Sequence, residues 1–179
     1  MKIEEFKNVT MIYMRHVGEY GLKNKELMET FKQFLKDNHL LNDQSVILGI
    51  ALDNPQIVPA DQLRYDVGLI VDETENDILP SRLIDDGKYA IFEVPHTAQG
   101  VQDFWIQIPK LAENLSIDEK KPILERYAMN KSRIICVNSV FHLNNINCIN
   151  KKDVLESIFS KIIQIIVKLC YNESVNKSS

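Results

Sequence analysis

The sequence predicts an α+β fold, in which duplicated βαββ units form a curved, mainly antiparallel sheet with helices on one face and a central ligand cleft. Two observations lead to this prediction. The first half of the 179-residue chain reads strand–helix–strand–strand, and the second half begins the same order again. The acidic stretch 72–86 joins the two halves.

The first half supplies one complete unit. Val9–His16 is rich in β-forming residues and ends at the turn-prone GEYG sequence. Lys25–Leu40 carries one apolar stripe at spacings of three and four residues, which is typical of a helix. Two strands are expected next, at Val46–Leu52 and Arg64–Val71, with a polar, proline-bearing loop between them.

The second half repeats this order through its third element. Lys88–Val94 is the opening strand, and Val101–Leu115 has the apolar face of a helix. Pro109 should kink or divide that helix, because proline removes a backbone hydrogen bond. Ile123–Met129 is the next strand, and the fourth element should fall at 134–143.

Composition and charge argue against several classes of function. The net charge of −4 disfavours direct nucleic-acid binding, because phosphate neutralisation requires a basic face. The start of the chain lacks the features of a secretory signal, and the longest apolar stretch, Ile158–Cys170, is too short and polar to cross a bilayer. We therefore expect a cytoplasmic protein that does not bind membranes.

No sequence motif requires a metal or cofactor. The three cysteines and four histidines are scattered without the spacing of metal ligands. P-loop, GxGxxG and GxSxG motifs are missing from the sequence. We therefore expect no cofactor.

Four phrases in succession resemble the GyrI-like small-molecule-binding domain, which is also the effector-binding domain of multidrug-responsive MerR- and AraC-type regulators. They are YMRHVGEYG at 13–21, GIALDNP with RYDVGLIVD at 49–72, GKYAIFEV with FW at 87–105, and PILERY at 122–127. The resemblance implies two βαββ modules around a cavity lined by aromatic side chains, with a buried acidic residue. In relatives this cavity takes flat, often cationic hydrophobic compounds. This chain has no room before Val9 for a DNA-binding domain, so we expect a standalone member.

Glu125 is the strongest candidate for a functional residue. Alternation along Ile123–Met129 places it on one strand face with Tyr127. A carboxylate between apolar neighbours is costly to bury unless it is neutralised or paired. In a cavity it attracts cations or takes the raised pKa that a general acid or base needs. The structural alternative is a salt bridge or a solvent-facing position, but the resemblance matches Glu125 to the family's pocket glutamate.

Four other residues are candidates for ligand contact. Trp105 and Tyr127 offer aromatic faces that suit flat or cationic ligands. Tyr65 is a weaker candidate, because strand tyrosines usually serve sheet packing. Met14 offers an adaptable contact surface, although core packing is the simpler interpretation.

Two further groups are expected to be structural. Arg64 and Asp66 share one strand face, so we expect them to support each other. His16 and His96 lie beside turns and have no sequence partner that suggests catalysis.

These observations favour a non-catalytic module that binds hydrophobic small molecules, including cationic ones. Two alternatives stay open: a hydrolase of electrophilic cyclopropane-type compounds, in which Glu125 activates water, and an interaction protein of the gyrase-inhibitor type. The expected partner is a small-molecule ligand, and the chain is expected to be a monomer or a homodimer.

The composition changes abruptly after Arg133. From residue 134 onward the chain has no glycine, proline, alanine or tryptophan. The resemblance implies a last strand similar to YYMCEFCIPF, and a DNA stretch that encodes this peptide can be read as IICVNSVFHL after loss of one T. We therefore hypothesise a one-base deletion, which makes 1–143 the domain, with 134–143 doubtful as its last strand, and 144–179 an atypical tail. The alternative is a genuine extension with a helix at 152–171.

Overall fold

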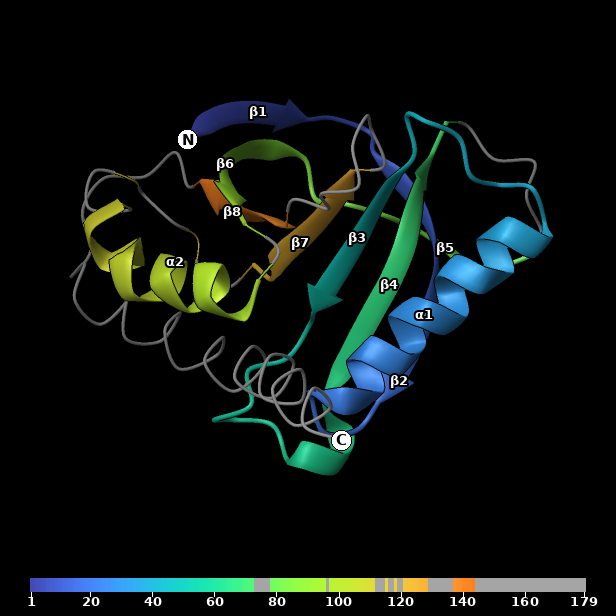
Figure 1. Ribbon diagram of the computed structural model, residues 1–179, viewed down its shortest axis with the longest axis horizontal. Helices are drawn as coiled ribbons and strands as arrows, with labels where there is room; N and C mark the ends of the chain where they lie inside the picture. The colour runs from blue at the N-terminus through green and yellow to red at the C-terminus, as the bar shows by residue number, and fades with distance from the viewer. Residues whose placement is uncertain are drawn as a thin grey trace.

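The computed structural model describes residues 1–72, 78–95, 97–111, 115, 118, 121–128 and 137–143 (Figure 1). Its elements, in chain order, are β1 (Lys2–Phe6), β2 (Thr10–Val17), α1 (Leu22–Asp37), β3 (Val46–Ala51), the 3-10 helix η1 (Ala60–Gln62), β4 (Arg64–Val71), β5 (Ser81–Leu83), β6 (Gly87–Val94), α2 (Ala98–Leu111), β7 (Ile123–Ala128) and β8 (Val137–Leu143).

The described strands form one antiparallel sheet in the order β1-β6-β8-β7-β3-β4-β2-β5. The units β2-α1-β3-β4 and β6-α2-β7-β8 each contribute three neighbouring strands, and the units meet where β3 pairs with β7. Helix α1 contacts β2 and β4, whereas α2 contacts β6 (Figure 1). The predicted α+β fold with duplicated βαββ units is therefore confirmed.

Two edge strands were missed by the sequence interpretation. β1 precedes β2 in the chain but pairs with β6, and β5 precedes β6 but pairs with β2. The second unit is thus extended by a strand that precedes the first unit, and the first unit is extended by a strand that lies between the two units. Ser81–Leu83 is only three residues long and lies in the stretch that was expected to be a linker. Such short, polar edge strands carry no clear alternation of apolar residues.

The last-strand position of the second unit is occupied by β8. It pairs with β6, where Lys88 lies opposite Leu143, and with β7, where Leu124 lies opposite Val140. Residues 134–136, the tail 144–179 and the helix expected at 152–171 lie outside the described residues.

Helix α2 continues through Pro109 to Leu111, so the expected division of this helix is wrong. Pro109 removes one backbone hydrogen bond in the last turn of the helix, and only two helical residues follow it.

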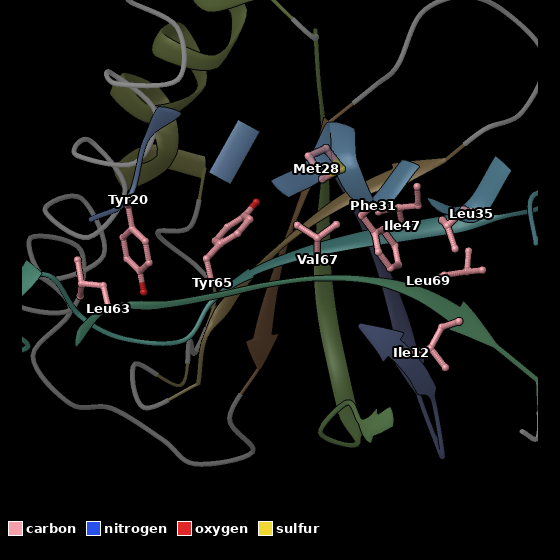
Figure 2. Packing of buried hydrophobic residues seen from close by; sticks show 10 residues of the cluster. All are labelled: Ile12, Tyr20, Met28, Phe31, Leu35, Ile47, Leu63, Tyr65, Val67 and Leu69. Atoms are coloured by element: carbon pink, nitrogen blue, oxygen red, sulfur yellow. The ribbon is translucent and has the colours of Figure 1, made fainter. Parts of the chain in front are cut away.

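The sheet carries a hydrophobic cluster on each face. On the side of α1, ten buried residues pack together (Figure 2): Ile12, Tyr20, Met28, Phe31, Leu35, Ile47, Leu63, Tyr65, Val67 and Leu69. The opposite cluster consists of Phe6, Met11, Leu48, Ile50, Ile84, Tyr89, Ile91 and Leu124. Neighbours such as Ile47 and Leu48 enter different clusters, because successive strand side chains point to opposite faces.

The sheet curves toward the face without helices. Arg126 on β7 donates to Glu4 on β1, although β8 and β6 lie between these strands. In a flat sheet three strand spacings would separate the two backbones by about 14 Å, and side chains that stand roughly perpendicular to the sheet would not bridge that distance. The ion pair therefore requires the curvature that the sequence analysis predicted.

Arg64 and Asp66 do not pair with each other as the sequence analysis expected, because they bind different partners. Arg64 forms a two-pronged ion pair with Asp53, at 2.9 and 2.7 Å. Asp66 is fully buried and accepts from Arg15 at 2.6 and 2.9 Å and from Arg82 at 2.9 Å. The cause is the strand register, which places Arg15 directly opposite Asp66. Since Arg82 belongs to β5, Asp66 also fastens that edge strand to the first unit.

Asp66→Asn should lower the free energy of unfolding by about 3 kcal/mol, because it removes the negative partner of a buried ion pair. This is the low end of the usual cost, since the Arg15 and Arg82 side chains remain 33% and 30% exposed. Urea unfolding measures the effect. The control is Glu26→Gln, which breaks an exposed pair with Lys23 and should change stability by less than about 1 kcal/mol. Equal effects of the two substitutions would contradict the assigned role.

Candidate functional site

The candidate site lies at the centre of the sheet, where the two units meet. In the β3–β7 pair, Gly49 lies directly opposite Glu125. Tyr65 belongs to the cluster under α1, and Tyr127 packs against that cluster. Because Glu125 is two residues from Tyr127 on the same strand, its side chain points to the same, helix-bearing face.

Two tyrosine hydroxyls converge on one carboxyl oxygen. Tyr65 Oη donates to Glu125 Oε2 at 2.8 Å, and Tyr127 Oη lies 3.0 Å from the same oxygen. The two tyrosines come from β4 and β7, which lie on either side of β3. The Tyr65 bond therefore ties β4 of the first unit to β7 of the second unit across β3.

Gly49 makes this arrangement possible. A Cβ atom built on Gly49 would lie 2.3 Å from Tyr65 Oη and 3.1 Å from Glu125 Oε2. A larger residue would therefore occupy the space in which the hydroxyl meets the carboxyl group. Sequence reasoning did not identify Gly49, because its importance arises only from the pairing of two strands that lie far apart in the chain.

Burial changes the acid–base behaviour of this group. Loss of solvent raises the pKa of Glu125 above its ordinary value of 4.5, and the hydrogen bonds from Tyr65 and Tyr127 oppose this shift without cancelling it. The pKa of Tyr65 is also raised, by burial and then by the neighbouring Glu125 charge. The carboxyl group is surrounded by protein, although part of the Glu125 residue remains accessible. Such a group accepts a positive charge or a proton readily.

Tyr20 supports the site from the start of α1. Its hydroxyl donates to the carbonyl oxygen of Arg64 at 2.9 Å and accepts from the Asp53 N–H at 3.0 Å. Its ring meets Tyr65 edge-on, with 6.2 Å between the ring centroids (Figure 2). Burial raises the pKa of Tyr20 to about 12, so its hydroxyl stays protonated and keeps donating. The GEYG turn, which the sequence analysis treated only as a helix-preceding turn, therefore positions Tyr65.

The remaining candidates differ in how they are placed. Met14 lies on β2 and packs, partly buried, against the cluster that contains Tyr65. Trp105 belongs to α2, but its side chain lies outside the described residues. The structure thus brings together Glu125, Tyr65 and Tyr127, with Met14 on the same side of the sheet.

Within the described ranges, the structure contains no group of three or more His, Cys, Asp or Glu side chains that could hold a metal ion. The helices in those ranges are also too short or too polar to cross a membrane.

Gly49→Ala should lower the free energy of unfolding by about 1–3 kcal/mol, the usual cost of overpacking a filled core. Tyr65→Phe removes the atom that the new methyl group would meet at 2.3 Å. The loss of unfolding free energy in the Gly49→Ala/Tyr65→Phe double variant should therefore be smaller than the sum of the losses in the two single variants. A double-mutant cycle measured by urea unfolding checks this, and strictly additive effects would contradict the close contact.

The raised pKa of Glu125 also predicts a pH dependence of stability. The folded state holds the Glu125 proton more tightly than the unfolded chain, so this group stabilises the fold below pH 4.5. That contribution disappears as the pH rises from 4.5 through the raised folded-state pKa. The stability of Glu125→Gln relative to the wild type should therefore increase across this window and then level off. Unfolding curves at pH 4, 6 and 8 measure the difference, and a constant difference would refute the shift.

Comparison with known proteins identifies the domain. The profile of the GyrI-like small-molecule-binding domain matches residues 1–134. YosT, a candidate transcriptional regulator from the SPbeta prophage of Bacillus subtilis (strain 168), is 43% identical over 129 residues, which cover 70% of this chain and 86% of YosT.

Two solved structures share the fold at low sequence identity. SAV2435, solved with bound tetraphenylphosphonium, superposes with a TM-score of 0.55 at 12% identity, over 80% of this chain and 93% of that one. The C-terminal domain of EcmrR gives a TM-score of 0.56 at 13% identity, over 81% and 97%. On the strength of the matching profile and of the close relative YosT, this chain belongs to the GyrI-like small-molecule-binding domain family.

Proposed function

We propose that this protein binds hydrophobic small molecules that carry a positive charge, with Glu125 as the partner of that charge. One observation carries the proposal. In the part of the chain that the structure describes, Glu125 has no lysine or arginine partner, and its hydrogen bonds come from the neutral hydroxyls of Tyr65 and Tyr127. A desolvated carboxyl group held in this way gains most from an external cation.

The tyrosines add to the selectivity of such a site. Tyr65 and Tyr127 fix the orientation of the carboxyl group, and their aromatic rings favour flat or cationic groups. Trp105 and Met14 remain proposed ligand contacts. Rigid positioning reduces the entropy that is lost on binding, because fewer side chains must be ordered when the ligand arrives.

The comparisons support the same class of ligand. SAV2435, which shares the fold, was solved with tetraphenylphosphonium, a hydrophobic cation. YosT is a candidate transcriptional regulator. We infer that this chain is an effector-binding module of the kind that reports the presence of a small molecule to transcription.

Tetraphenylphosphonium should bind the wild-type protein with a micromolar Kd, and Glu125→Gln should weaken binding about tenfold or more, equivalent to about 1.4 kcal/mol. Isothermal titration calorimetry measures both values. The matched control ligand is triphenylphosphine oxide, which is aromatic but uncharged, and its weaker binding should not depend on the charge of Glu125. The matched control variant is Glu93→Gln, which removes an exposed carboxylate from β6. Unchanged tetraphenylphosphonium affinity in Glu125→Gln would overturn the proposal.

A hydrolase is the second candidate, and the observation that favours it is the raised pKa of a carboxyl group beside two hydroxyls. Such a group can act as a general base toward water. Turnover of a cyclopropane-type electrophile that disappears in Glu125→Gln would favour the hydrolase. A binding module consumes none of the compound.

A further inference from the structure

Two side chains near Tyr65, His16 and Asn24, carry buried polar atoms that have no hydrogen-bond partner in the described part of the chain. Among the described residues, His16 Nε2 and both amide atoms of Asn24 are buried and unpartnered. Asn24 is only 1% exposed. Buried amides are almost always hydrogen-bonded, because an unsatisfied donor or acceptor costs free energy. A pair of such groups at one place therefore points to a ligand.

The strand register places His16 next to Tyr65. The two residues lie directly opposite each other in the β2–β4 pair. Opposed residues of antiparallel strands have their Cβ atoms about 5 Å apart on the same face. His16 also alternates with Ile12 and Met14, which contact the cluster under α1, so its side chain points to the helix-bearing face.

The geometry of α1 places Asn24 at the same end of the cluster. Asn24 is buried, one turn before the buried residue Met28, on the stripe that faces the sheet. In Figure 2, Met28, Phe31 and Leu35 follow one another away from the end that holds Tyr65. Asn24 therefore lies at the Tyr65 end.

A hydrogen bond at the start of α1 supports this placement. The Tyr20 hydroxyl donates to the Arg64 carbonyl oxygen, and Arg64 precedes Tyr65 in β4. This bond fixes the chain two residues before α1 begins at Leu22. The first turn of the helix is therefore held beside Tyr65.

The first turn of α1 also favours electron-rich groups. Its N-cap is Gly21, which offers no side-chain cap, and the first turn contains no acidic residue. No acidic side chain within the first turn therefore offsets the positive end of the helix dipole. A carbonyl or carboxylate oxygen is the kind of group that such an end and the Asn24 amide bind together.

We propose that Asn24 and His16 form a second, polar subsite, which binds a hydrogen-bond acceptor on the ligand while Glu125 binds its positive charge. The inference rests on the proposed function, because it assigns a second contact to the same ligand. Tyr65 lies between the two ends of the site, since its hydroxyl binds Glu125 and its strand neighbour is His16. The favoured ligands are aromatic cations that carry an ester, amide or carboxylate group.

Three cationic probes test the subsite. Rhodamine 123 carries an ester, whereas pyronin Y has the same three-ring cationic core without the ester-bearing ring, and tetraphenylphosphonium has no acceptor. Asn24→Leu should raise the Kd of rhodamine 123 about tenfold and change the other two less than twofold. It should also raise Tm, because it removes an unpartnered buried amide. Asn24→Ser, which restores a hydroxyl, should recover part of the rhodamine 123 affinity.

The outcomes separate the two proposals. Equal effects of Asn24→Leu on all three probes, or a lowered Tm with no change in probe preference, would overturn the subsite and leave the cation site intact. The opposite pattern is a lower affinity for rhodamine 123 alone in Asn24→Leu, together with unchanged affinities for all three probes in Glu125→Gln. That pattern would support the subsite and overturn the cation site. A wild-type protein that binds none of the probes would overturn both.

Discussion

The pairing of β3 with β7 is the contact on which the fold and the site both depend. It joins the two βαββ units, and it brings Gly49 opposite Glu125. Without a glycine at that point, Tyr65 could not place its hydroxyl on the Glu125 carboxyl group. The same pairing therefore joins the two halves of the sheet and places the Glu125 carboxyl group, which can ionise, at the centre of the sheet.

Exchange of edge strands holds this centre in place from both sides. β5 is fastened to the first unit through Asp66, and β1 reaches back to β7 through Glu4. Separation of the two units would therefore break the strand pairing of β1 with β6 or of β5 with β2. This arrangement fits a site in which a carboxyl group must stay desolvated and oriented before any ligand arrives, because a rigid surrounding prevents water and local motion from neutralising its effect.

Sequence patterns predicted the two units because each central strand carries a distinct apolar run. Alternation also placed Glu125 and Tyr127 on one face, as the structure has them. Three features depended on contacts between distant segments and had no local signal: Gly49 needs the β3–β7 register, the partners of Asp66 need the β2–β4 register, and Asn24 resembles any polar residue in a first helical turn. β8 occupies part of the segment 134–143, so a strand forms there although the profile match ends at residue 134.

The central claim is that ligand charge is met by the Glu125 carboxyl group. A direct measurement is the pH titration of the Glu125 side-chain carboxyl carbon by NMR, without ligand and with saturating tetraphenylphosphonium. The account predicts a pKa above 4.5 in the free protein and a lower pKa when the cation is bound, because a nearby positive charge favours the ionised form. A titration curve that the bound cation leaves unchanged would contradict it.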